Sequence, residues 1–197
     1  IMTEYCMKSM DLFEKVGMLD KAAKAAERLA SFADSLNNEQ TIKLYDRSIA
    51  LYKKSGDIDN LAYSYENLAY YYSKFKSKDT IKLAILYCDS ALNIWKDYEN
   101  VVCKIRNLNI KVNCYSRLEQ TENIFDQRQK QFEFANLNKD STLIVNTSLN
   151  LADSYFDDII SGKLKDIDSA LFYYELAKRY LPKRWVKYPI DFSSKFL

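Results

Sequence analysis

Apolar side chains return every three or four positions along most of this 197-residue chain, and short polar segments separate the runs. This spacing is typical of helices that bury one face, because an α-helix completes a turn in 3.6 residues. No stretch makes a convincing strand. The pattern predicts an all-α protein with helices at residues 1–15, 20–36, 41–54, 60–75, 81–96, 100–117, 121–137, 141–160 and 168–181.

Turn and capping residues mark the ends of several of these helices. Gly17 follows the first apolar run, where a glycine commonly ends a helix. Ser55-Gly56-Asp57 is expected to form a tight turn between two helices. The helix–turn–helix pattern around it recurs along the chain with less similar residues. Asp20, and either Ser141 or Thr142, are the expected N-caps of the helices that they precede.

The composition agrees with a folded helical protein. Hydrophobic residues make up 48% and charged residues 28%, which excludes a disordered chain. Only 3 Gly and 2 Pro occur, too few for the turns of a β-rich protein of this size. The net charge of +2 gives no reason to expect nucleic acid as a partner. No run of about 18 apolar residues is present, so we expect no membrane insertion within this chain.

The residue types and their spacing give little indication of a metal site. The chain has no histidine, the commonest general base and metal ligand. A buried free cysteine packs as a small apolar side chain, and a disulfide or redox role is the alternative. Four cysteines, without CxxC or other paired metal spacing, each fall in a helical pattern: Cys6, Cys88, Cys103 and Cys114.

Catalysis is equally weakly indicated. Asp157-Asp158 and the pair Asp166/Asp168 flank a loop at Ser161-Gly162, but an acid/base pair needs a pocket that separates two pKa values. No glycine-rich phosphate loop or nucleophile motif occurs. We expect no catalytic residue, no cofactor and no metal, and any enzymatic activity would reside in a domain outside this chain. The start at Ile1 leads us to expect a piece of a longer protein.

An internal repeat organises the chain. In every second helix a leucine returns about 40 residues further on, at Leu29, Leu68, Leu108 and Leu151. In the intervening helices a small residue recurs in register, with one exception at Arg128: Ser9, Ser48, Ala91, Arg128 and Ala177. A unit of two helices cannot bury its own apolar face, so such units are expected to stack.

The repeat resembles the tetratricopeptide family. Ala170, Tyr174, Ala177 and Pro182 match the A…F…A…P signature, and Leu68-Ala69 with Tyr72 is similar to the family's L-G-x-x-Y. The resemblance implies a right-handed α-solenoid of tetratricopeptide-like helix pairs over residues 1–182, with a tail or linker at 183–197. The period exceeds the usual length of roughly 34 residues and approaches that of HEAT and armadillo repeats, which are the alternative solenoids.

The same resemblance implies a partner-binding groove along the leading helix of each pair. Counting from the repeat leucines, the groove positions are Glu27, Ser31, Asp34, Tyr63, Glu66, Tyr70, Ser73, Arg106, Ile110, Asn113, Asn146, Asp153 and Phe156. Tyr65 and Tyr72 fall at packing positions, whereas Tyr63 and Tyr70 are either groove contacts or half-exposed filler. Arg106 is the sole cation among the groove positions, which disfavours the clamp for chaperone C-terminal carboxylates found in some members.

The implied function is non-catalytic binding of a protein or peptide on the concave face. The sequence pattern of the repeat unit at residues 48–72 resembles that of repeat arrays in the sensory region of bacterial two-component sensor kinases and related transcriptional regulators. A sensor ectodomain would be periplasmic, and the protein would otherwise be cytoplasmic. The alternatives are a free-standing adaptor and a self-association module that forms a homodimer.

The segment 183–197 differs in character from the rest of the chain. A basic-aromatic cluster comprises Lys183, Arg184, Trp185, Lys187 and Tyr188. Such a cluster is consistent with a cap packed over the last helix, a juxtamembrane segment or a linker to a following domain.

Overall fold

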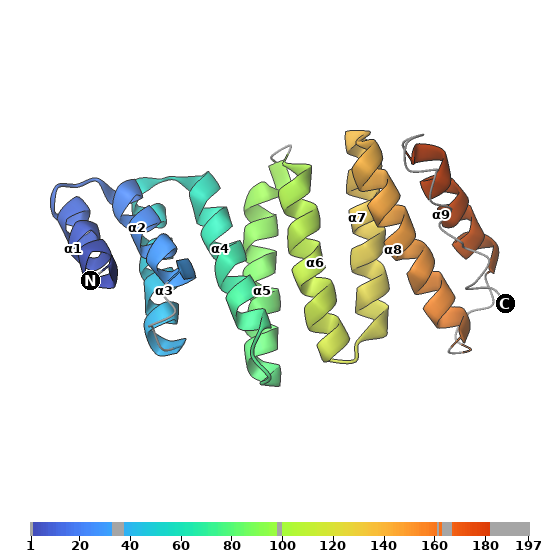
Figure 1. Cartoon of the computed structure of the whole chain (residues 1–197), viewed down its shortest axis with the longest axis horizontal. Coiled ribbons are helices and arrows are strands. Elements are labelled where there is room, and N and C mark those ends of the chain that lie inside the picture. The colour runs from blue at the N-terminus through green and yellow to red at the C-terminus, as the bar shows by residue number, and fades with distance from the viewer. Residues whose placement is uncertain (1, 33–37, 98–99, 161, 163–166, 182–197) are drawn as a thin grey trace. The chain divides into compact units, whose positions relative to one another are not determined.

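The structure is a computed structural model, and it describes residues 2–32, 38–97, 100–160, 162 and 167–181. Within these residues the secondary structure is entirely helical, which confirms the expected all-α class. The elements are α1 (Met2–Lys15), α2 (Leu19–Phe32), α3 (Asn38–Ser55), α4 (Ile58–Ser73), α5 (Lys78–Ile94), the 3-10 turn η1 (Trp95–Asp97), α6 (Val101–Arg117), α7 (Thr121–Asn138), α8 (Ser141–Ile160) and α9 (Ile167–Tyr180) (Figure 1).

The predicted turn at 55–57 fixes the start of α4. Gly56 has φ of +78°, a conformation that costs glycine little and other residues more. Asp57 is the N-cap, and its carboxylate accepts hydrogen bonds from the backbone N–H of Asn60 at 3.1 Å and from the Asn60 side chain at 2.7 Å. Asn100 caps α6 in the same way by accepting from the Cys103 N–H at 3.3 Å.

Two other expected caps are wrong. Asp20 lies inside the first turn of α2, which already begins at Leu19. α8 begins at Ser141, and the carboxylate of Asp140 accepts from the backbone N–H groups of Thr142 and Leu143 at 2.8 and 3.0 Å. In that case an acidic side chain one residue earlier satisfies the free N–H groups of the first turn, so neither Ser141 nor Thr142 does so.

The chain divides into two compact units, residues 1–119 and 120–197. In the first unit each helix from α1 to α6 packs against the next one along the chain, and α4 also contacts α6. The repeat leucines of this unit, Leu29, Leu68 and Leu108, are all buried. The single array expected over residues 1–182 stays a prediction.

The tyrosines expected at packing positions do pack. Tyr65 and Tyr72 are half-buried, and both rings stack on Tyr87 of α5, with centroids 6.0 and 5.7 Å apart. The cysteines also behave as packing residues. Cys88, Cys103 and Cys114 are buried, Cys6 is half-buried, and all four are free thiols.

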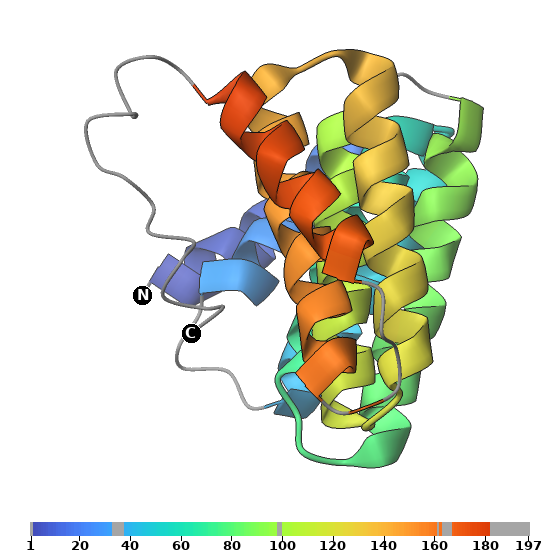
Figure 2. The ribbon, with the colours of Figure 1, turned by 90° about the vertical axis from the view of Figure 1, so that its right-hand side faces the viewer.

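In the second unit α8 contacts both α7 and α9 (Figure 2). Leu151 is buried, as are the described members of the signature, Ala170, Tyr174 and Ala177. Arg128, the exception in the small-residue register, donates to the Asn150 carbonyl and the Ser154 hydroxyl of α8 at 2.7 and 2.6 Å. Pro182 and the basic-aromatic cluster at 183–188 lie outside the described residues.

Candidate binding pocket between α4 and α6

A pocket of about 590 Å³ lies between α4 and α6, within the first unit. Six of the residues that line it are predicted groove positions: Tyr63, Glu66, Tyr70, Arg106, Ile110 and Asn113. The other two lining residues, Asn67 and Asn109, were not predicted.

Helical spacing brings these side chains together. On α4 the lining residues are Tyr63, Glu66, Asn67 and Tyr70, and their offsets of 0, +3, +4 and +7 place them on one face of the helix. The lining residues of α6 repeat the same offsets from Arg106 to Asn113. Since the repeat leucines of both helices point into the core, these faces remain for the pocket.

Glu66 and Arg106 form an ion pair at the base of the pocket. The Arg106 Nε donates to one carboxylate oxygen of Glu66. The other oxygen accepts from the Asn107 carboxamide at 2.5 Å. The Glu66 side chain is only 6% exposed, and burial raises the pKa of its carboxyl although Arg106 and Asn107 favour the ionised form. Both oxygens of this carboxylate are therefore engaged within the protein.

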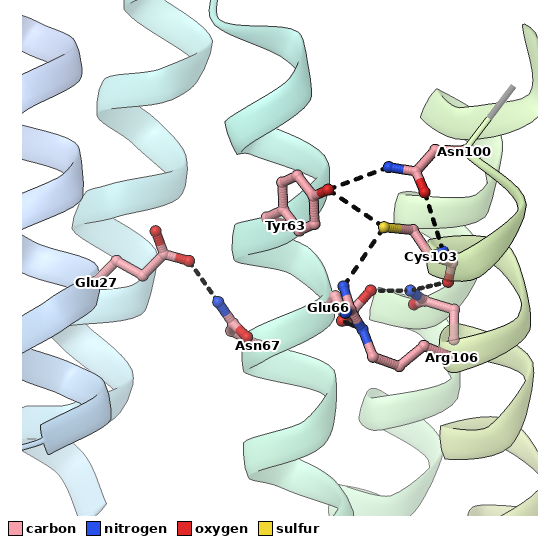
Figure 3. A network of polar contacts seen from close by, with 8 residues as sticks. Glu27, Tyr63, Glu66, Asn67, Asn100, Cys103 and Arg106 are labelled. Carbon is pink, nitrogen blue, oxygen red and sulfur yellow. Dashed lines mark hydrogen bonds and ion pairs between the residues drawn. The ribbon is translucent and has the colours of Figure 1, made fainter. Parts of the chain in front are cut away.

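Tyr63, a lining residue of the pocket, belongs to a small polar network (Figure 3). Its hydroxyl accepts from the Asn100 carboxamide at 3.1 Å and from the Cys103 thiol at 3.3 Å. The Arg106 guanidinium lies 5.8 Å from the Tyr63 ring centroid, and its Nη2 donates to the Cys103 Sγ at 3.5 Å. The edge-on contact with Trp95, at 5.3 Å, fixes the other side of the ring. The pKa of Tyr63 is raised. The interaction with Cys103 contributes most to this shift, and burial contributes next.

Tyr70 lies seven residues further along α4 and is 54% exposed. The Lys74 ammonium lies over its ring, 4.2 Å from the centroid. Ser73, a predicted groove residue, donates its hydroxyl to the Tyr70 carbonyl at 2.7 Å and does not line the pocket.

An acid–amide pair is repeated across the leading helices. Asn67 donates to the Glu27 carboxylate at 2.5 Å, just as Asn107 donates to Glu66 (Figure 3). In both pairs the glutamate lies two residues before a repeat leucine and the asparagine lies one residue before the next. Burial raises the pKa of Glu27, partly offset by the hydrogen bond from Asn67. Aligning the repeats on their leucines shows asparagine at the same offset in three units, at Asn67, Asn107 and Asn150, and this signal was available in the sequence.

The remaining predicted groove positions do not meet at this pocket. Ser31 on α2 shares a hydrogen bond with the Tyr45 hydroxyl at 3.1 Å, and Asp34 lies outside the described residues. In the second unit, Asn146 is exposed and Phe156 is half-buried. The Asp153 carboxylate accepts from the Tyr174 hydroxyl at 2.6 Å, so Asp153 ties α8 to α9.

Neither a metal centre nor a membrane helix is found in the part of the chain that the structure describes. Within it, no three histidine, cysteine, aspartate or glutamate side chains come together in a way that could hold a metal ion. No helix there combines the length and the apolar character that a membrane crossing needs.

Comparison of the chain with protein-family models and with curated proteins found no match. The resemblance to tetratricopeptide repeats therefore depends on the recurring residues alone.

Proposed function

We propose that this chain is a non-catalytic repeat domain of the tetratricopeptide-like α-solenoid type that binds a protein or peptide through the α4/α6 pocket. The observation that supports it most is a convergence. Six positions chosen only by their distance from the repeat leucines line one pocket of about 590 Å³. That volume falls within the range of roughly 300–1,000 Å³ typical of ligand sites.

The chemistry of the lining suits a peptide. Asn109 and Asn113 bring carboxamides, which can both donate to and accept from a peptide backbone, and Asn67 lies beside them with its carboxamide already donating to Glu27. Tyr63 and Tyr70 offer large contact areas at a low entropic cost. Ile110 belongs to the buried core and is 7% exposed, so only a small apolar edge of it lines the pocket. Hydrogen-bonding groups between apolar rings are a common design for recognition rather than for bond cleavage.

The biological setting that we propose is the sensory or interaction region of a larger bacterial signalling protein, such as a two-component sensor kinase. This proposed setting depends on the resemblance of the repeat unit's sequence pattern to the arrays of such proteins. Self-association is the second candidate, and the exposed apolar side chains of α1 favour it. Tyr5 and Leu12 of that helix are 68% and 61% exposed.

Peptide selection tests the proposed function. A random peptide library is selected on the immobilised chain, and the affinities of selected peptides are measured by calorimetry for wild type and for Tyr70→Ala/Asn113→Ala. Both replaced side chains are exposed and line the pocket. We expect the double variant to weaken binding at least about tenfold, since truncating central contact residues typically costs more than 1 kcal/mol. Its melting temperature should stay near that of wild type.

The matched control is Tyr5→Ala/Asn93→Ala, which removes the same two residue types from exposed positions on α1 and α5. Peptides that bind the Tyr70→Ala/Asn113→Ala variant as tightly as wild type would contradict the proposal, whether or not the control variant binds them more weakly. Charge reversal at Arg106 is unsuitable for this purpose, because it would place a second carboxylate against the buried Glu66.

A further inference from the structure

The charge that the α4/α6 pocket offers to a ligand is positive. Glu66 and Arg106 are its only charged lining residues among the described residues. Glu66 is nearly inaccessible, and both of its oxygens accept hydrogen bonds from the protein. The Arg106 side chain is 49% exposed, so the cation of the pair faces the ligand and the anion does not.

Arg106 is also held in place. Its Nε is fixed by Glu66, its Nη2 by the Cys103 thiol, and its plane lies near the Tyr63 ring. A guanidinium that is ordered before binding loses less side-chain entropy when a carboxylate pairs with it.

A second cation, Lys74, lies beside the lining residue Tyr70, although Lys74 does not itself line the pocket. Lys74 is exposed, and its ammonium lies over the ring of Tyr70. Tyr63 and Tyr70 are seven residues apart on α4, which corresponds to about 10 Å along a helix that rises 1.5 Å per residue. Each cation lies near one of these rings, which places the two positive groups toward the two ends of this face of α4.

An extended peptide matches this spacing. Its residues advance by about 3.3 Å, so side chains three positions apart are separated by about 10 Å along the chain and point to opposite sides of it. The two cations also come from the two helices that flank the pocket, Arg106 from α6 and Lys74 from the end of α4. Between the two ends the pocket presents asparagine carboxamides and Ile110, which suit a backbone and one or two small apolar side chains.

We propose that the α4/α6 pocket binds an extended peptide segment with two acidic side chains three residues apart, one paired with Arg106 and the other with Lys74. This inference rests on the proposed peptide-binding function and names the chemical class of its ligand.

Three blocked hexapeptides test the charge requirement: acetyl-SEALES-amide, acetyl-SQALQS-amide and acetyl-SKALKS-amide. Each is titrated into the isotopically labelled chain, and binding is followed by NMR through the side-chain signals of Asn109, Asn113 and Arg106. We expect the glutamate peptide to shift these signals and to bind about tenfold more tightly than the glutamine peptide, because hydrogen bonds to charged groups are the stronger ones. The lysine peptide should leave the side-chain signals unchanged, and added salt should weaken the binding of the glutamate peptide.

Variants assign the two pairings. Lys74→Gln should lower the affinity for the glutamate peptide about threefold, as expected for the loss of an exposed ion pair. The double variant Glu66→Gln/Arg106→Gln removes the other cation without leaving a buried unpaired carboxylate, and it should weaken the peptide about tenfold. Lys82→Gln, at an exposed lysine of α5, is the control and should not alter the affinity.

The outcomes separate this inference from the function on which it rests. If the glutamine peptide binds the pocket as tightly as the glutamate peptide, the acidic ligand is wrong and peptide binding stands. If none of the three peptides shifts the pocket signals while selected library peptides do, the acidic ligand is again wrong. If no peptide of either kind shifts them, both proposals are overturned.

Discussion

At the scale of single residues, the acid–amide pairs explain why buried glutamates occur on the leading helices. Glu27 and Glu66 each accept a short hydrogen bond from an asparagine of the following leading helix. An unpaired carboxylate at such a position would be costly, and a paired one costs less. Glu66 gains an arginine in addition, whereas Glu27 has neutral hydrogen-bond donors and only the charge of Lys24 near it.

Glu27 should therefore limit stability at neutral pH. Burial raises its pKa above the usual 4.5, so the folded state holds this proton more tightly than the unfolded state does. The stability linked to this proton is fully present below pH 4.5 and is lost as the pH rises through the raised pKa. Glu27→Gln should raise the free energy of unfolding at pH 7 by roughly 0.5–1 kcal/mol, a modest gain because the site is partly solvated. Urea unfolding at pH 7 and pH 4.5 measures it, and the gain should shrink at the lower pH.

Glu39→Gln is the control for this prediction. Glu39 is exposed and pairs with Lys43 at 2.6 Å, and that hydrogen bond lowers its pKa. Removing its charge should not stabilise the protein at pH 7. A Glu27→Gln variant less stable than wild type at pH 7 would show that the ionised carboxylate is favourable where it lies.

At the scale of elements, turn chemistry was read more reliably from the sequence than helix starts were. The Gly56-Asp57 turn is where the residues placed it, and Asn100, expected as the first residue of its helix, is the N-cap of α6. α3 and α5 begin three residues earlier than predicted, at Asn38 and Lys78 rather than at 41 and 81. Their first turns are polar and mostly exposed, so apolar periodicity gives no signal there.

The Asp57 cap should matter for α4, which carries half of the pocket. Asp57→Ala removes the acceptor for the Asn60 N–H, and we expect a loss of about 1 kcal/mol in the free energy of unfolding. Asp59→Ala is a matched control, because Asp59 is an acid in the first turn of the same helix and has no cap hydrogen bond. Thermal and urea unfolding compare the two. Equal losses would mean that only the negative charge near the helix start matters and that the cap does not.

At the scale of the whole molecule, the sequence located the face of the pocket but not all of its residues. Counting from the repeat leucines identified six lining residues, because a helical offset fixes the direction of a side chain. The count missed Asn67 and Asn109, which lie next to the repeat leucines at the edge of that face. It also selected Asp153, whose carboxylate is taken by Tyr174, since an offset does not reveal what a neighbouring helix supplies.

The polar interior of the second unit was harder to foresee. Gln127, Gln131, Thr147 and Ser148 are buried in α7 and α8, although their side chains are polar. Apolar periodicity counts such positions as exposed, so the repeat is only weakly visible in this region of the sequence. Burial of polar side chains is set by contacts between helices, which no local pattern contains.

The central claim is that a peptide binds between α4 and α6. A crystal structure of the chain with a peptide selected on it is the most direct test. We expect an extended peptide along the two helices, in contact with Tyr63, Tyr70 and Arg106. A peptide bound elsewhere, for instance on the exposed apolar face of α1, with the pocket residues free of it, would contradict the account.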